Sequence, residues 1–168
     1  GGLDLFMYIA GVLLPTTPTT YEFEKDCKMM EVNALGGIAW FNAVAALFQS
    51  AHAGQIVGVS SVASDRGRVG NPGYNASKAA LSTYLEALRN RLTRFGVHVL
   101  TVKPGFMDTE MLKNSQRTFW VASPEKAADD IHKALRARRQ TVYTLGRWGL
   151  VMLIIRHIPS VIFRRLSF

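Results

Sequence analysis

The chain has 168 residues, of which 48% are hydrophobic and 19% are charged, and its net charge is +8. A chain of this length and composition can bury the core of one domain, which excludes intrinsic disorder as its main state. Its single cysteine, Cys27, excludes a scaffold held together by disulfide bonds within the chain.

The positive charge is concentrated toward the carboxyl end of the chain. Residues 1–130 carry twelve basic and twelve acidic side chains, whereas residues 131–168 carry eight Lys and Arg and no acidic residue. Charge clustered in this way is typical of contact with a polyanion or an anionic membrane surface. No zinc pattern or groove-reading motif accompanies it, so we expect no nucleic-acid partner.

The chain opens with an apolar run and not with a secretory signal. Its first four residues carry no basic side chain, and residues 3–10 have the length and character of a buried strand. Because a domain seldom begins inside its own core, we expect a further segment to precede this run in the natural protein.

Strand and helix patterns alternate along the chain. The spacing from Thr19 to Glu22 is that of a capping box, and Ser123 before Pro124 is a strong helix start. Gly96 is placed to end the helix that precedes it. The predicted strands are about residues 3–9, 55–59, 97–102 and 141–145, and the predicted helices are about residues 19–49, 72–95 and 123–138.

This alternation predicts the α/β fold class, with a parallel sheet covered by helices on both faces. Ligands bind such sheets beyond the carboxyl ends of the strands. We therefore expect a binding site near Ala10-Gly11, Ser60-Ser61 and Pro104-Gly105, which directly follow three of the predicted strands.

Tyr74 and Lys78 lie four residues apart at the start of a predicted helix, so their side chains share one face. A cation beside a phenol lowers the pKa of the phenol, which makes tyrosine a usable general acid or base near neutral pH. The spacing alone is common in ordinary amphipathic helices. Two further residues favour a catalytic site: Ser61, which follows a strand, and Asn33, a short amide inside a helix.

With these residues in place, the chain resembles the C-terminal two-thirds of a classical short-chain dehydrogenase/reductase. The resemblance runs from about residue 3 to residue 145, with the motifs in the family's order and spacing. It implies a Rossmann-like doubly wound parallel sheet that lacks its N-terminal βαβ units in this chain. The matching motifs are Val59-Ser60-Ser61-Val62-Ala63, Tyr74-Asn75-Ala76-Ser77-Lys78-Ala79-Ala80, Asn33, and Pro104-Gly105 with Thr109.

The resemblance assigns a role to each of four catalytic residues. Tyr74 would donate a proton to a carbonyl oxygen, or remove one from an alcohol. Lys78 would bind the nicotinamide ribose and lower the pKa of Tyr74. Ser61 would hydrogen-bond the substrate oxygen, and Asn33 would anchor a water that links Lys78 to solvent.

The resemblance also implies that NAD or NADP is the cofactor. Ala10 and Gly11 would lie against the ribose on the adenosine side, and Pro104 and Gly105 would let the backbone lie against the nicotinamide. Thr109 would bind the carboxamide, and Tyr74 and Lys78 complete the cofactor contacts. We expect no metal, because the four histidines are scattered without ligand spacing.

The chain departs from the family in two places. The usual Asn-Asn-Ala-Gly after the first strand reads Tyr8-Ile9-Ala10-Gly11, so the first asparagine's role in bracing the sheet is lost or replaced. No glycine-rich phosphate loop occurs in these 168 residues. We therefore expect these residues alone neither to bind NAD(P) tightly nor to turn over substrate.

We divide the chain into residues 1–146, the C-terminal part of the dehydrogenase domain, and residues 147–168, a basic apolar tail. The tail is too short and too interrupted to span a bilayer. Its composition is that of a helix at a membrane surface, and the alternatives are a helix that closes the substrate pocket or a subunit contact. Phe119 and Trp120 are expected in a lid over substrate or in the core. Asp65, Arg66 and Arg68 are expected in a solvated loop, and the alternative is that they contact substrate.

The sequence thus predicts an NAD(P)-dependent oxidoreductase that interconverts a carbonyl and a secondary alcohol, acting on a small apolar substrate. The alternative is a non-catalytic relative that serves as a binding or membrane-associated module. We expect a homo-oligomer in the cytoplasm, with residues 147–168 as the candidate contact to the inner face of an anionic membrane.

Overall fold

The structure is a computed structural model that describes residues 2–114 and 118–166. In this part of the chain, four strands form one sheet, and every neighbouring pair is parallel. The strands are β1 (Leu5–Tyr8), β2 (Gln55–Val59), β3 (His98–Pro104) and β4 (Thr141–Thr144), in that spatial order. The predicted α/β, Rossmann-like fold is confirmed.

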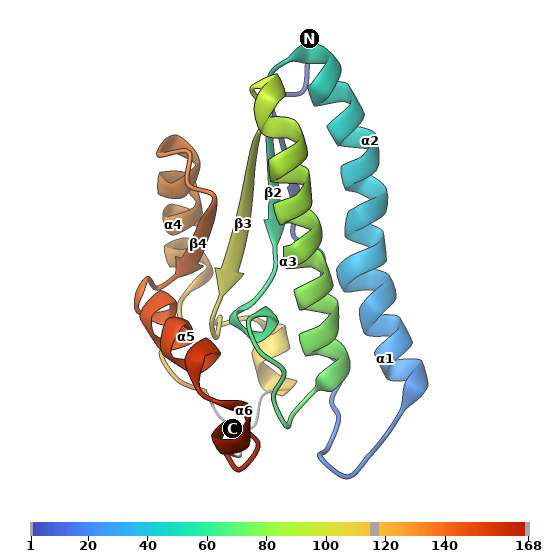
Figure 1. Ribbon diagram of the computed structural model, residues 1–168, viewed down its shortest axis with the longest axis vertical. Coiled ribbons are helices and arrows are strands. Elements are labelled where there is room, and N and C mark those ends of the chain that lie inside the picture. The colour runs from blue at the N-terminus through green and yellow to red at the C-terminus, as the bar shows by residue number, and fades with distance from the viewer. Residues whose placement is uncertain (1, 115–117, 167–168) are drawn as a thin grey trace.

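Helices cover both faces of this sheet, as Figure 1 shows. Helices α2 and α3 pack on one face, and α4 packs against β3 and β4 on the other. The helices are α1 (Phe23–Met30), α2 (Gly36–Ala51), α3 (Pro72–Leu92), α4 (Pro124–Arg136), α5 (Arg147–His157) and α6 (Ser160–Phe163). A π-helical segment, η1 (Glu31–Leu35), joins α1 to α2, and short 3₁₀ turns form η2 (Val62–Ser64), η3 (Thr93–Phe95) and η4 (Glu110–Asn114).

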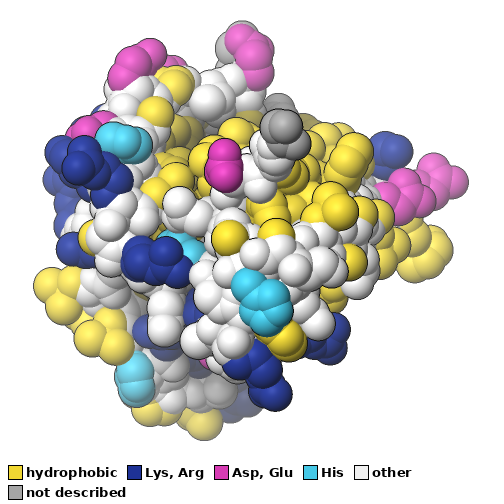
Figure 2. Space-filling model, turned by 90° about the horizontal axis from the view of Figure 1, so that it is seen from above, with side chains coloured by type: hydrophobic (Ala, Val, Ile, Leu, Met, Phe, Trp, Pro, Cys, Tyr) yellow, Lys and Arg dark blue, Asp and Glu magenta, His cyan; other side chains and the backbone are white. Residues whose placement is uncertain are grey.

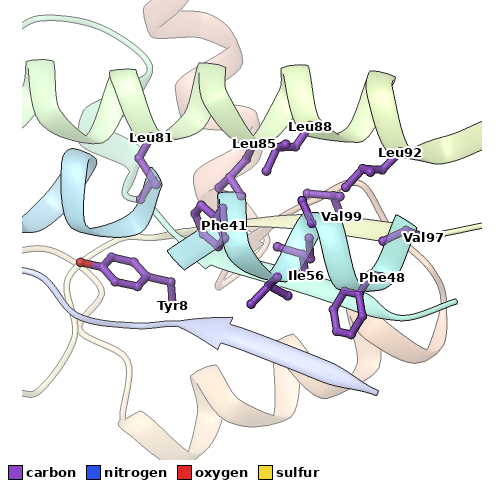
Figure 3. Packing of buried hydrophobic residues seen from close by; sticks show 12 residues of the cluster. Tyr8, Phe41, Phe48, Ile56, Leu81, Leu85, Leu88, Leu92, Val97 and Val99 are labelled. Atoms are coloured by element: carbon purple, nitrogen blue, oxygen red, sulfur yellow. The ribbon is translucent and has the colours of Figure 1, made fainter. Parts of the chain in front are cut away.

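The two cores follow from the alternation of side chains along the strands. Ile56 and Val99 face α2 and α3, whereas Val57 and Leu100 face α4. In the first core, the leucines that are spaced at helical intervals on α3 lie in a row above the strands (Figure 3). This row consists of Leu81, Leu85, Leu88 and Leu92.

Gly58 lets α3 approach β2 closely. A Cβ atom at this position would lie 2.4 Å from Cδ1 of Leu85, which is too close for any other residue. The glycine in the strand therefore fixes the spacing between the sheet and α3, the helix that carries Tyr74 and Lys78.

The capping box expected from Thr19 to Glu22 does not form. Glu22 is itself the N-cap of α1 and makes no side-chain cap hydrogen bond. The Thr19 hydroxyl instead shares a hydrogen bond with the Thr17 hydroxyl at 3.2 Å, and the Thr20 hydroxyl accepts one from the Thr17 backbone N–H at 3.0 Å. The threonine-rich turn before α1 therefore engages the Thr19 side chain that would have capped the helix, and the helix begins at Phe23.

One edge of the sheet stays uncovered in the described residues. β1 pairs with β2 only, and Leu3, Leu5 and Ile9 on or beside it are exposed. Figure 2 shows hydrophobic side chains exposed over a broad area of the face seen from above. An open apolar edge of this kind is liable to pair with another strand.

By length and hydropathy, one helical stretch in the described part of the chain, Phe23–Ala51, could cross a membrane. Its inner side lies in the core, where Phe41, Val44 and Phe48 are buried between the sheet and α3. We therefore interpret this stretch as a core helix of the domain.

Candidate functional site

The candidate site lies at the carboxyl ends of the strands, toward the lower end of Figure 1. Ser61 follows β2 in an extended conformation and caps η2, with its Oγ accepting a hydrogen bond from the Ala63 N–H at 3.1 Å. The side chain is almost fully buried. The β2 strand thus presents the Ser61 hydroxyl toward the first turn of α3, where it hydrogen-bonds Tyr74.

Lys78 is buried on the same face of α3 as Tyr74. Its side chain donates a hydrogen bond from Nζ to the Val59 carbonyl at 3.0 Å, and Nζ lies 5.9 Å from the centroid of the Tyr74 ring. Only 3% of the residue is exposed. This burial lowers the pKa of Lys78 to about 8, because the charged ammonium is poorly solvated there.

Burial has the opposite effect on Tyr74 and raises the pKa of its phenol. Two neighbours counteract this rise: the hydrogen bond with Ser61 and the positive charge of Arg68. The groups that favour the phenolate are therefore Ser61 and Arg68, whereas the sequence had pointed to Lys78, whose own charge is desolvated.

Asn33 links the loop after β1 to α3. Its Oδ1 accepts a hydrogen bond from the Val12 N–H at 2.7 Å, and its Nδ2 donates to the Val12 carbonyl at 2.9 Å and to the Ser77 Oγ at 3.0 Å. The residue is fully buried within the π-helical segment η1. These contacts satisfy both amide donors and give the amide oxygen a partner, which explains why a helix interior tolerates an asparagine here.

Gly11 is packed against two of the predicted catalytic residues. A Cβ atom at Gly11 would lie 3.0 Å from Nζ of Lys78 and 3.2 Å from Oδ1 of Asn33. The backbone after β1 therefore approaches the lysine and the asparagine more closely than a side chain would comfortably allow. Ala10, the neighbouring residue, is exposed at the same strand end.

Tyr8 replaces the family's first asparagine and makes a bracing contact of its own. Its hydroxyl donates a hydrogen bond to the Val32 carbonyl at 2.6 Å. Val32 lies in η1, so the tyrosine ties β1 to the π-helical turn that carries Asn33. Gly36 and Gly37 make room for it, because a Cβ atom on Gly36 would lie 2.7 Å from the tyrosine oxygen.

Pro104 ends β3, and Gly105 beyond it is packed against Trp148 of α5. A Cβ atom at Gly105 would lie 2.0 Å from the indole Nε1, which excludes any other residue while the indole occupies this position. Thr109 lies further along, exposed in a shallow hollow that Asp108, Glu110 and Leu112 also line. The structure thus brings Ser61, Tyr74, Lys78, Asn33 and Gly11 together, with Pro104-Gly105 at the next strand end.

The loop after Ser61 is tied down, contrary to the expectation that it is solvated. The Asp65 side chain is only 2% exposed and forms an ion pair with Lys103 of β3. It also accepts a hydrogen bond from the Tyr143 hydroxyl at 2.7 Å. Burial raises the pKa of Tyr143, and the Asp65 carboxylate raises it further, so the phenol stays protonated as the donor.

Arg66 fixes α5 to the same loop. Its guanidinium donates to the carbonyls of Ile155, Arg156 and Ile158 at 2.6 to 3.1 Å and lies 4.0 Å from the centroid of the Phe163 ring. It therefore caps the carboxyl end of α5, where free carbonyls and the helix dipole favour a cation.

An aromatic cluster lies beside Gly105. Trp148 makes edge contacts with Phe106 and Trp120 at centroid distances of 5.9 and 5.3 Å, and Phe106 contacts Phe119. The Trp148 Nε1 is buried without a hydrogen-bond partner in the described structure. Phe119 and Trp120 are both half exposed, so they form the outer wall of this cluster.

Sequence reasoning missed the parts of the site that depend on distant contacts. Arg68 beside Tyr74, the ion pair of Asp65 and the packing of Trp148 on Gly105 all join segments that are far apart in the chain or have no spacing signature. Within the described residues, no group of three or more His, Cys, Asp or Glu side chains could hold a metal ion.

Fold and site together define a class of protein: the chain belongs to the short chain dehydrogenase family, whose sequence profile matches residues 1–119. An uncharacterized oxidoreductase of Myxococcus xanthus is 40% identical over 111 residues, which are 66% of this chain and 44% of that protein. Dehydrogenase/reductase SDR family member 7B of Danio rerio is 28% identical, over 98% of this chain and 57% of that protein. The chain spans about half the length of these relatives.

Solved structures agree with this assignment. A short chain dehydrogenase from Burkholderia cenocepacia, in complex with NADP, has a TM-score of 0.84 and 25% identity, covering 98% of this chain and 69% of that chain. A short-chain dehydrogenase from Sphingobium yanoikuyae, in complex with NADPH, has a TM-score of 0.74 and 19% identity. The match covers 94% of this chain and 66% of that chain. The second likeness supports the fold alone.

Proposed function

We propose that the protein containing this chain is an NAD(P)-dependent oxidoreductase that interconverts a carbonyl and a secondary alcohol. The observation that carries the proposal is the convergence of Ser61, Tyr74 and Lys78 at the ends of β2 and α3. A tyrosine hydroxyl next to a serine hydroxyl and a buried ammonium can move a proton to or from a substrate oxygen.

Each residue has a defined part in this reaction. Ser61 donates a hydrogen bond to the substrate oxygen and polarises the carbonyl, and Tyr74 transfers its hydroxyl proton to that oxygen. Lys78, with a pKa of about 8, is poised to exchange protons near neutral pH. The nicotinamide supplies the hydride when it is bound.

The residues at the strand ends fit a dinucleotide. Gly11 carries no side chain where the backbone meets Lys78 and Asn33, so the loop after β1 can lie against the two residues that would face the cofactor. Ala10, Pro104 and Thr109 border the same end of the sheet. We assign Ala10, Gly11, Tyr74, Lys78, Pro104, Gly105 and Thr109 to the cofactor, and the NADP bound to the Burkholderia cenocepacia dehydrogenase supports this choice.

Asn33 is proposed as a positioning residue. Both N–H donors of its amide are used by Val12 and Ser77, and its Oδ1 accepts from Val12, so we assign the anchored water to the backbone of the π-helical turn. The widened turn of η1 makes such a role reasonable, because π-helical turns leave backbone carbonyls outside the regular hydrogen-bond pattern.

The alternative is a non-catalytic module with the same fold. Burying a lysine beside a tyrosine costs stability, because both groups are desolvated. Catalysis requires these groups in this arrangement, whereas an interaction module does not. The complete catalytic constellation therefore favours the enzyme.

The experiment is a carbonyl reduction assay on the full-length gene product that contains this chain. NADH and NADPH consumption is followed with a panel of ketones and aldehydes, and NAD(P) reduction with the corresponding alcohols. Ser61→Ala should lower the rate about 10²- to 10⁴-fold, the usual contribution of such groups, while Ser50→Ala, an exposed serine on α2, should not. No turnover of any carbonyl or alcohol by the wild type contradicts the proposal.

We also propose a homo-oligomer. The outer side of the helix formed by η1 and α2 exposes Leu35, Trp40 and Leu47, although Phe41 and Phe48 on its inner side are buried. Large apolar side chains grouped on one helix face are typical of a subunit contact. Sedimentation velocity of the full-length protein tests this, and Trp40→Ser should shift the distribution toward the monomer.

Finally, we propose that residues 147–168 contact an anionic membrane from the cytoplasm. Trp148 and Met152 bury the inner side of α5, which leaves Leu150, Leu153 and Ile154 exposed on its outer side. Val161 and Ile162 continue the apolar surface, and Arg147, Arg156, Arg164 and Arg165 are exposed around it. An apolar face bordered by arginines is suited to the lipid headgroup region.

Liposome sedimentation tests the membrane proposal. Vesicles of phosphatidylcholine with and without phosphatidylserine are compared at low and high salt, since each arginine near an anionic surface contributes about 1 kcal/mol. The double variant Arg164→Glu/Arg165→Glu should lose binding. The control Arg91→Glu/Arg94→Glu, at exposed positions in the last turn of α3 and in η3, should keep most of it. Equal binding to neutral and anionic vesicles contradicts the electrostatic mechanism.

A further inference from the structure

The loop between η2 and α3 carries three charged side chains, and two of them are fully engaged. Asp65 is paired with Lys103, and Arg66 is used by the carbonyls at the end of α5. Arg68, within the described part of the chain, makes neither a hydrogen bond nor an ion pair. Its five N–H donors are therefore available to a ligand.

Arg68 is half buried in a shallow pocket between this loop and the first turns of α3. Ala63, Ser64, Gly67 and Asn75 also line the pocket, and Arg68 is its only charged residue among those described. Burial lowers the pKa of the guanidinium, which nevertheless stays protonated at any physiological pH. A partly desolvated cation without a counter-charge is stabilised when an anion binds it.

The pocket adjoins the catalytic residues. Ala63 and Ser64, two and three residues after Ser61, both hydrogen-bond Ser61, the first from its N–H to the Ser61 Oγ at 3.1 Å and the second from its hydroxyl to the Ser61 carbonyl at 2.7 Å. The charge of Arg68 is close enough to act on Tyr74. A substrate whose carbonyl oxygen meets Ser61 and Tyr74 therefore has Arg68 within reach. The hollow beside Thr109 is bordered by Asp108 and Glu110, so a negative group is disfavoured there and favoured beside Arg68.

We propose that Arg68 binds an oxyanion, a carboxylate or a phosphate, that the carbonyl substrate carries close to its reacting carbon. This inference rests on the proposed oxidoreductase function and makes the substrate class more specific. The aromatic cluster of Phe106, Phe119, Trp120 and Trp148 is suited to the apolar remainder of such a substrate.

The reaction itself is unchanged by this assignment. The carbonyl carbon gains a hydride from the dihydronicotinamide, and the carbonyl oxygen gains the proton of Tyr74, so that the products are the alcohol and the oxidised nicotinamide. Arg68 stays bound to the oxyanion throughout, and its contribution is expected in substrate binding and orientation.

The test compares charged and neutral substrates in the full-length protein. The pairs are 3-oxohexanoate with its methyl ester and dihydroxyacetone phosphate with dihydroxyacetone, and the pair that shows the larger difference identifies the oxyanion. The wild type should favour the charged member, and Arg68→Leu should lose about 10- to 100-fold in kcat/KM for it, mainly through KM. For the neutral member, Arg68→Leu should stay within threefold of the wild type.

Two further variants sharpen the comparison. Arg94→Leu removes the same charge from an exposed position and should behave as the wild type does. Arg68→Lys keeps the charge without the bidentate geometry and should recover only part of the lost affinity. In ¹⁵N-labelled protein, the Arg68 Nε–Hε resonance should shift on titration with 3-oxohexanoate or dihydroxyacetone phosphate and stay in place with their neutral counterparts.

The outcomes that overturn the inference are distinct. Equal loss of kcat for both members of a pair in Arg68→Leu means that Arg68 acts on Tyr74 and not on the substrate. Turnover by the wild type without preference for the charged member also overturns the inference and leaves the oxidoreductase function standing. No turnover of any carbonyl overturns the proposed function, and this inference with it.

Discussion

Replacing Lys78 by methionine should stabilise the protein although it removes a residue of the site. Burial lowers the pKa of Lys78 from 10.5 to about 8, so keeping the ammonium charged in the folded state costs about 3 kcal/mol. Methionine has a similar length and no charge. It loses the hydrogen bond to the Val59 carbonyl, which offsets about 1 kcal/mol of the gain. At pH 7, Lys78→Met should therefore raise the free energy of unfolding by about 2 kcal/mol.

The stabilisation by Lys78→Met should depend on pH, because Lys78 loses its proton at different pH values in the folded and unfolded states. Between pH 8 and 10.5 the unfolded chain keeps a proton on Lys78 that the folded protein has released. The free energy of unfolding of the wild type therefore rises with pH in this range, by about 1.4 kcal/mol per unit from this group. Below pH 8 both states are protonated and the cost is constant. The advantage of the variant should shrink to near zero by pH 10.

Urea unfolding followed by circular dichroism at pH 7 and pH 10 measures both effects. Lys28→Met, at a lysine that is exposed on α1, is the matched control and should change the free energy of unfolding by less than about 0.5 kcal/mol at either pH. A variant that is less stable than the wild type at pH 7, or a difference that does not change with pH, would refute the burial of a charged Lys78.

Three further predictions concern the helix α5 and the cofactor. Gly105→Ala forces a methyl group against the indole of Trp148 and should destabilise the protein by about 1–3 kcal/mol, a loss that Trp148→Ala in the same chain should partly relieve in thermal unfolding. Arg66→Leu removes the cap of α5 and should increase hydrogen exchange of the amides of α5 and α6 at least tenfold, while β2 and β3 stay protected. The 168-residue chain alone should show no micromolar binding of NADPH in a fluorescence titration, because pyrophosphate recognition in this architecture uses a glycine-rich turn that these residues do not contain. A micromolar dissociation constant for a monodisperse monomer would contradict this last prediction.

The sequence predicted the order and type of the main elements because their signals are local. The leucine spacing on α3, the Ser123 cap of α4 and the strand patterns all depend on neighbouring residues, and each element lies close to its expected bounds. The capping box at Thr19 failed for the same local reason, since a competing turn lay two residues before it. The convergence of Ser61 and Tyr74 followed from the topology of a parallel sheet.

The rest of the site depends on contacts that have no local signal. Asp65 meets Lys103, 38 residues away, and Arg66 meets the carbonyls of α5, about 90 residues away. The π-helical turn at Asn33 has no residue pattern of its own, because it arises where Tyr8 and Val12 engage that segment from the strand side. A solvated loop was therefore the expectation for residues that the fold holds firmly in place.

The central claim is that Tyr74 is the proton donor to a substrate oxygen, and Tyr74→Phe in the full-length protein tests it most directly. Carbonyl reduction and the dissociation constant of NADPH are measured together, with Tyr21→Phe, at a fully exposed tyrosine, as the control. Our account predicts a loss of about 10²- to 10⁴-fold in kcat, with NADPH binding within threefold of the wild type. A loss of less than tenfold would contradict it.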